Sequence, residues 1–216
     1  NATAGFSVVT YTGTGANTTV GHGLSVTPSM LIIKRRDNTS NWTVWHKNLT
    51  SAQRLLILEL DFWADTDYPT FLNNTAPTSS VFSVGTSTNT NASSGTYVAY
   101  CFTAIAGYSA FGSYTGNGST DGPFVFTNMR PRWVMIKRTD STSDWVILDT
   151  SRNTYNVVNN TLWADLSSAE STAYSWLDIL SNGFKFRDSA NGLNNNGGTY
   201  IYAAFAENPF KLSLAR

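Results

Sequence analysis

The chain has 216 residues, of which 41% are hydrophobic and 13% charged; 14 basic residues balance 14 acidic ones, and the pI is about 6.9. This balance argues against nucleic acid as a partner, because nucleic-acid binding depends on a basic surface, and the 13% aromatic share excludes a disordered chain. The single cysteine excludes an internal disulfide, and no apolar run approaches the roughly 18 residues of a membrane-spanning helix.

The first half of the chain predicts strands separated by turns. Residues 6–12 are β-branched and aromatic and end at a Gly-Thr-Gly turn, and residues 30–34 form a short apolar run after Pro28. A polar turn at 37–41 leads into a returning strand at 42–45. Further strands are expected at 55–60, 81–84 and 96–102, the last of which carries Cys101 as a buried, unreactive thiol.

The second half continues in the same way. Residues 145–148 predict a strand, and residues 183–187 alternate between apolar and polar side chains. Only two segments have helical features, residues 51–54 and 167–180, and both are expected to be loops with short helical turns.

The two halves repeat one pattern. Tyr11-Thr12-Gly13 aligns with Tyr114-Thr115-Gly116 at an offset of 103 positions, and the same offset aligns Pro28 with Pro131 and Trp42 with Trp145. In the middle the offset is 100, which aligns 62–65 with 162–165 and implies a loop-length difference. The predicted fold is therefore all-β: two tandem homologous antiparallel β-sandwich modules, jelly-roll or lectin-like, at residues 1–106 and 107–216.

The usual catalytic constellations are not apparent. His22 lies in a Gly-His-Gly-Leu loop and His46 follows a strand, and the aligned positions in the second half are Val125 and Asp149. We therefore expect both histidines to be turn or surface residues, and expect neither an enzyme nor a metal site or cofactor.

A recurring Trp-Ala-Asp sequence gives the best ligand-binding candidates: Trp63 with Asp65, and Trp163 with Asp165. One interpretation is a carboxylate that binds sugar hydroxyls beside a stacking Trp; the other is an Asp that caps a loop beside a core Trp. Of the remaining tryptophans, Trp42 and Trp145 are expected in the core, and the unmatched Trp45, Trp133 and Trp176 at an interface.

Four segments carry a resemblance to a known class of proteins: GFSVVTYTG (5–13), VGHGL (20–24), PSMLIIKRR (28–36) and YAAFAENPFK (202–211). Together they resemble the modules of bacteriophage tail-fibre and other virion structural proteins. The resemblance implies a virion surface role, as a homo-oligomer, often a trimer, that contacts a host cell-surface glycan or other virion subunits. In the second half the VGHGL stretch is replaced by PFVFT (123–127).

The sequence leaves three functions open. The first is a non-enzymatic virion protein, in a tail or head fibre or as a decoration module, that attaches to the host or assembles the particle. The second is a subunit of an extracellular filament or surface layer, which the polar, uncharged composition also suits. The third is a lectin-like module or carbohydrate-active enzyme built on the Trp-Ala-Asp pairs. We therefore expect a location on the virion surface or outside the cell.

Overall fold

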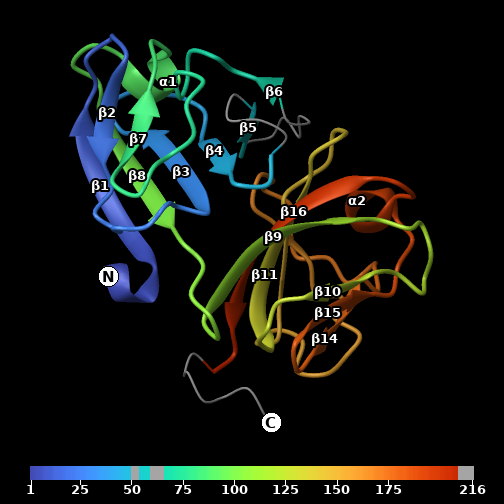
Figure 1. Ribbon diagram of the computed structural model, residues 1–216. Coiled ribbons are helices and arrows are strands. Elements are labelled where there is room, and N and C mark those ends of the chain that lie inside the picture. The colour runs from blue at the N-terminus through green and yellow to red at the C-terminus, as the bar shows by residue number, and fades with distance from the viewer. Residues whose placement is uncertain (50–53, 59–65, 209–216) are drawn as a thin grey trace. The chain divides into compact units, whose positions relative to one another are not determined.

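The structure is a computed structural model that describes residues 1–49, 54–58 and 66–208. It is built almost entirely of antiparallel strands, so the predicted all-β class is confirmed. The chain divides into two compact units, the first reaching Ala104 and the second beginning at Ile105 (Figure 1). Each unit contains its own sheets and its own core.

The first unit has a larger and a smaller sheet. In the larger sheet the strand order is β1-β8-β3-β4-β5-β6, and β2 pairs with β7 in the smaller one. The bounds are β1 (Phe6–Thr12), β2 (Thr18–Gly21), β3 (Met30–Arg35), β4 (Thr43–His46), β5 (Arg54–Ile57), β6 (Thr66–Asp67), β7 (Val81–Val84) and β8 (Thr96–Phe102).

The core of the first unit lies between these sheets. Side chains alternate along a strand, so every second residue of β8 is buried, including Cys101 as predicted. Leu31 and Ile33 of β3 belong to the same apolar cluster as Phe82 and Val84 of β7. The cluster therefore joins the larger sheet to the smaller one.

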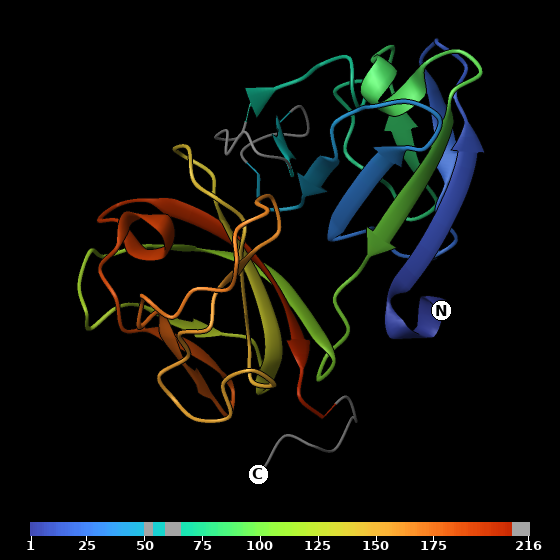
Figure 2. The same ribbon diagram turned by 180° about the vertical axis from the view of Figure 1, so that it is seen from behind.

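The second unit also has two sheets. The larger has the order β13-β12-β11-β16-β9 and the smaller the order β10-β15-β14; Figure 2 shows the unit in yellow-green to red. The bounds are β9 (Ser109–Thr115), β10 (Phe124–Phe126), β11 (Pro131–Arg138), β12 (Val146–Asp149), β13 (Leu162–Trp163), β14 (Leu177–Leu180), β15 (Gly183–Phe186) and β16 (Thr199–Ala206).

The second unit is a sandwich around one apolar cluster. Ile136 and Leu148 enter this cluster from the larger sheet, while Val125, Ile179 and Phe184 enter it from the smaller sheet. Tyr114 and Tyr200 stack with ring centroids 4.8 Å apart at one side of the cluster. Residues of both sheets thus share a single core, as in a β-sandwich.

The few helices lie where the sequence did not predict them. They are a 3₁₀ turn, η1 (Ala2–Ala4), and two four-residue helices, α1 (Thr88–Asn91) and α2 (Asn191–Asn194). The Ser87 hydroxyl caps α1 by accepting a hydrogen bond from the Asn89 N–H at 3.2 Å. The described part of the chain contains no helix long and apolar enough to cross a bilayer.

The expected helical turn in residues 167–180 is wrong. The structure has no helix there, and the end of the segment is strand β14, whose Leu177 and Ile179 face the core. Tertiary burial of this alternating pattern overrides the weak helical spacing. Of the other expected turn, residues 51–53 lie outside the described residues.

The tryptophans also differ from expectation. Trp145 is buried as predicted, whereas Trp42 is only half-buried and stacks on Tyr100 at 6.4 Å. Trp45 and Trp176 were expected at an interface, and this is wrong, because each is buried in the core of its own unit. An indole at the end of a strand can fill the space between two sheets, and local sequence does not reveal this.

Candidate functional site

The structure locates one of the two predicted Trp-Ala-Asp pairs. Trp63 and Asp65 lie outside the described residues. Trp163 lies on β13, half-buried against the core, and Asp165 follows it with 7% of its surface exposed. The Asp165 carboxylate accepts a hydrogen bond from the backbone N–H of Trp145 at 3.1 Å, so it ties the chain after β13 to the start of β12.

Asp165 belongs to a buried group that also contains Lys137 of β11. Burial raises the pKa of Asp165 from 3.8 to about 6, and the charge of Asp144 adds to this shift. Lys137 is fully buried, and burial lowers its pKa to about 8, although the nearby Asp165 and Asp144 oppose this shift. The Lys137 ammonium donates a hydrogen bond to the Ser143 carbonyl at 2.6 Å.

The first unit contains the aligned lysine. Lys34 donates to the carbonyl of Ser40, and its ammonium lies 5.4 Å from the centre of the Trp42 ring. In both units, therefore, a lysine holds the turn that joins two neighbouring strands. This shared role of the lysine is structural. In the second unit the charge of the nearby Asp165 also acts on the pKa of Lys137.

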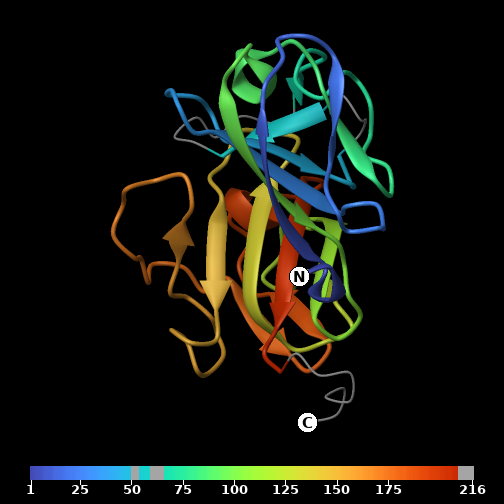
Figure 3. The same ribbon diagram turned by 90° about the vertical axis from the view of Figure 1, so that its left-hand side faces the viewer.

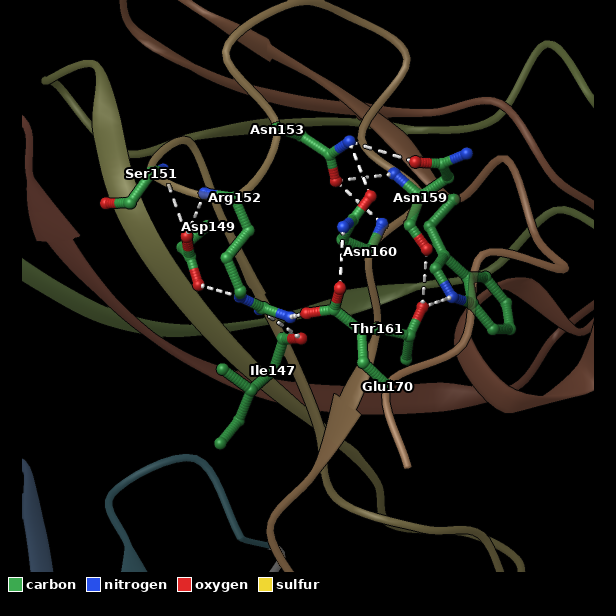
Figure 4. Close-up of polar contacts among 10 residues, drawn as sticks. Ile147, Asp149, Ser151, Arg152, Asn153, Asn159, Asn160, Thr161 and Glu170 are labelled. Atoms are coloured by element: carbon green, nitrogen blue, oxygen red, sulfur yellow. Dashed lines mark hydrogen bonds and ion pairs between the residues drawn. The ribbon is translucent and has the colours of Figure 1, made fainter. Parts of the chain in front are cut away.

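The long connection between β12 and β14 (Figure 3) carries a larger polar network (Figure 4). Arg152 is at its centre: its guanidinium donates to Asp149 at 2.7 Å and to Glu170 at 2.6 Å. It also lies 3.4 Å from the carbonyl oxygen of Ile147 on β12. The Arg152 side chain lowers the pKa of Glu170, so both carboxylates are ionised at neutral pH.

Three asparagines extend this network (Figure 4). The Asn153 amide oxygen accepts from the backbone N–H groups of Asn159 at 3.1 Å and Asn160 at 2.6 Å. Its amide nitrogen donates to the side chains of the same two residues. Asn160 in turn donates to Glu170 at 2.7 Å. The side chain of Asn153 thus closes residues 153–160 into a loop, which we call the 153–160 loop.

The 153–160 loop is also fixed to the smaller sheet. The Asn156 side chain accepts from the N–H of Ile179 at 2.9 Å and donates to its carbonyl at 3.0 Å, as a neighbouring strand would. Val158 pairs with Leu177 of β14 and is buried. Between these anchors and Asn153, Tyr155 has 86% of its surface exposed. An aromatic side chain is therefore presented on a loop held at both ends.

The histidines and the cysteine are placed differently from a catalytic set. His22 and His46 were expected in turns or at the surface; both lie at turns, but a surface position is wrong, because each is only 1% exposed. His22 Nδ1 accepts from the Leu24 N–H and Nε2 lies 3.1 Å from the Thr78 carbonyl, while His46 Nδ1 accepts from the Asn48 N–H. Each ring satisfies a backbone group of a turn, which makes burial tolerable.

Burial raises the pKa of the Cys101 thiol to about 11, so it is protonated at neutral pH and is a poor nucleophile. Within the described residues, no three His, Cys, Asp or Glu side chains lie close enough to hold a metal ion.

Two structural asparagines were missed by the sequence interpretation. Asn91 and Asn194 are fully buried, and each amide donates to loop carbonyls while its oxygen accepts from a backbone N–H. They stand 103 positions apart, as do Gly15 and Gly118, whose backbone N–H groups donate to Asn91 and Asn194 respectively. The repeat offset could have revealed them, whereas the Arg152 network has no such signal because the first unit has His46 where the second has Asp149.

Three comparisons with known proteins complete these observations. A family model described as a domain of unknown function (DUF7483) matches residues 1–209. No curated protein and no solved structure matches the chain.

Proposed function

The chain belongs to the DUF7483 family, whose description gives no function, and we propose that it is a non-enzymatic attachment or assembly module of a virion surface. The observation that carries this proposal is the 153–160 loop, which holds the exposed Tyr155 in place through a network of side chains. The resemblance to tail-fibre and other virion structural proteins supplies the location.

We also propose that the two units are homologous sandwiches that arose by tandem duplication. The sequence offset supports this, and so do the strand orders, since β1-β8-β3-β4-β5 in the first unit corresponds to β9-β16-β11-β12-β13 in the second. A further support is the stacked pair Tyr11–Tyr97 at 5.0 Å, which corresponds to Tyr114–Tyr200 at 4.8 Å. The two units then share a scaffold, and a feature that only one unit has can be assigned to function.

The network that holds the 153–160 loop is specific to the sequence of the second unit, because His46 and Leu49 stand where the second unit has Asp149 and Arg152. Its polar groups satisfy one another, so they order the chain and are not themselves free to bind a ligand. Ordering a loop costs conformational entropy, and a network of hydrogen bonds offsets that cost. A loop whose backbone is ordered before binding loses little entropy on binding, and tyrosine in particular supplies a large contact area at low entropic cost.

The ligand class that fits best is a host cell-surface glycan. An exposed aromatic ring can stack on the apolar face of a sugar, and 86% of the surface of Tyr155 is exposed for such a contact. The resemblance favours a homo-oligomer, with a trimer as the expected form, or contact with other virion subunits. Multiple copies of a weak glycan site would then bind a cell surface through avidity.

Binding of the purified full chain to host cells and to their isolated surface polysaccharide tests the proposal. Tyr155→Ala is expected to reduce binding by about tenfold or more, since one buried aromatic contact is worth about that factor. Val8→Ala is the control, because Val8 is an exposed apolar side chain on β1 of the first unit and belongs to no surface proposed for binding. If Tyr155→Ala binds as well as the wild type, the assignment of the loop is wrong.

A further inference from the structure

Strand β10 forms an edge of the smaller sheet in the second unit and carries two exposed aromatic side chains. In the described residues it pairs on one side only, with β15. Val125 points into the core, whereas Phe124 is 44% exposed and Phe126 58% exposed on the outer face. An exposed edge strand with apolar side chains is a ready template for pairing with another strand.

The backbone of β10 is oriented for such pairing. Pro123 accepts a hydrogen bond from the N–H of Phe186 at 3.2 Å, and the N–H of Thr127 donates to Asn182 at 3.0 Å. Residues of an antiparallel strand face their partner alternately, so the odd-numbered residues of this segment bond to β15. The N–H and C=O groups of Phe124 and Phe126 therefore point away from β15, along the open edge.

The fold does not require aromatic side chains here. In the first unit Val20 of β2 pairs with Phe82, just as Val125 pairs with Phe184, so the strand pairing aligns Val125 with Val20 and corrects the sequence alignment with His22. The positions of Phe124 and Phe126 are then occupied by Thr19 and Gly21, both exposed. Part of Phe124 covers a glycine, since a Cβ on Gly183 would lie 3.0 Å from its ring. That packing does not account for Phe126, which is the more exposed of the two.

We infer that β10 binds β10 of a second copy of this chain, in antiparallel register about a two-fold axis at Val125. The partner is expected to be a second copy because the sequence Phe-Val-Phe is the same in both directions along the strand. In this register Phe124 of one copy lies opposite Phe126 of the other, twice, and each outward N–H meets an outward C=O. Aromatic pairs opposite one another stabilise an antiparallel sheet.

The charges next to β10 permit this contact. Lys185, which lies opposite Phe124 on β15, forms an ion pair with Asp121 at 2.9 Å. The ammonium is thus neutralised within its own unit, and the chain as a whole has no net charge, so two copies do not repel each other. The contact closes on itself and joins two copies, so by itself it gives a dimer and not the trimer that the resemblance favours.

Sedimentation velocity on the purified full chain over a range of concentrations tests this inference. The wild type is expected to dimerise, and Phe126→Lys to weaken the dimer by about tenfold or more, since lysine on an edge strand opposes pairing. Gly21→Lys, at the corresponding exposed position of the first unit, is the matched control and should leave the dimer unchanged, since a side chain at Gly21 meets nothing closer than 3.9 Å. Circular dichroism confirms that each variant is folded.

A charge exchange makes the test specific to the register. In the double variant Phe124→Glu with Phe126→Lys, each introduced carboxylate lies opposite an introduced ammonium of the other copy, so dimerisation should be regained. A wild-type monomer, an oligomer that Phe126→Lys leaves unchanged, or a double variant no better than Phe126→Lys would each overturn the inference. Glycan binding through Tyr155 is measured separately on the same variants, so failure of the dimer and failure of the proposed function are distinguishable.

Discussion

At the scale of single residues, the second unit buries one acidic and one basic side chain, Asp165 and Lys137, and the pKa values of both are shifted. Asp165 and Lys137 each titrate closer to neutral pH than in water, since burial disfavours both charged forms. Each satisfies a backbone group of a neighbouring turn. Their contribution to stability must therefore depend on pH.

The substitution Asp165→Asn should remove one part of this pH dependence. The folded state raises the pKa of Asp165 from 3.8 to about 6, so it binds more protons than the unfolded state between these values. Wild-type stability therefore falls as pH rises through this window, by roughly 3 kcal/mol at most, at about 1.4 kcal/mol per pKa unit. Denaturant unfolding across the window should show this slope in the wild type and its loss in the variant.

Asp121→Asn is the control of opposite sign. The ion pair with Lys185 lowers the pKa of Asp121, so its stabilising effect is present above the unfolded pKa and is lost as pH falls below about 4. In this variant the free energy of unfolding should still fall as pH rises through the window in which Asp165 titrates. The variant should be less stable than the wild type only at the higher pH values. An unchanged slope in Asp165→Asn would contradict the assignment of that carboxyl group.

The buried amides of Asn91 and Asn194 give a second prediction. Asn194→Ala leaves the N–H of Asn117 and the carbonyls of Ser119 and Asp188 without their partner, and should lower the free energy of unfolding by about 2–3 kcal/mol. Asn91→Ala should cost about as much. Asn196→Ala, at an exposed position next to the same turn, should change stability little, and thermal unfolding compares the three variants.

At the scale of elements, the long connection between β12 and β14 is held mainly by side chains. Its regular structure is limited to the two-residue strand β13 and a few isolated bridges. The strands of the larger sheet are held by backbone ladders instead. The connection should therefore open locally without unfolding the sandwich.

Asn153→Ala should increase this local opening. The backbone N–H groups of Asn159 and Asn160 lose their acceptor, so their hydrogen exchange should speed up by about tenfold or more, while the amides of β11 and β16 stay protected. Hydrogen exchange resolved by residue measures both. Glycan binding should fall in parallel, because Tyr155 is then no longer fixed. Equal exchange in variant and wild type would show that Asn153 does not order the loop.

Strand positions were the best predicted elements. Residues 81–84 and 96–102 are strands with the predicted bounds. An alternating or uniformly apolar run between polar turns favours a strand through local sequence alone. Helices α1 and α2 were not predicted, since each consists of four residues without an apolar period. Each ends in a buried asparagine, Asn91 or Asn194, whose side chain donates to a loop carbonyl about 75 positions away.

At the scale of the whole molecule, each described sheet lies within one unit. Thr103 and Ala104 bond back to Gly5 and Ser29 of the first unit, while the N–H of Ile105 donates to the Ser109 hydroxyl of the second. The peptide bond between Ala104 and Ile105 thus separates two sets of hydrogen bonds. In the part of the chain that the structure describes, each core cluster is built from residues of its own unit.

A protease site inserted between Ala104 and Ile105 should therefore be tolerated. After cleavage both fragments should keep the β-sheet signal in the far ultraviolet and the aromatic signal in the near ultraviolet, because every ladder survives the cut. The uncleaved insertion variant is the control. Loss of either signal on cleavage would show that one unit needs the other in order to fold.

The sequence by itself determined the all-β class, most strand positions, the repeat offset and the burial of Cys101. These follow from local alternation and spacing, which act within a few residues. Only the tertiary structure decided that His22 and His46 are buried, that Arg152 meets Glu170 across 18 positions, and that Phe124 and Phe126 lie on an open edge. Such placements depend on how the chain returns to a distant strand, and that is settled by packing of the whole unit and not by any one segment.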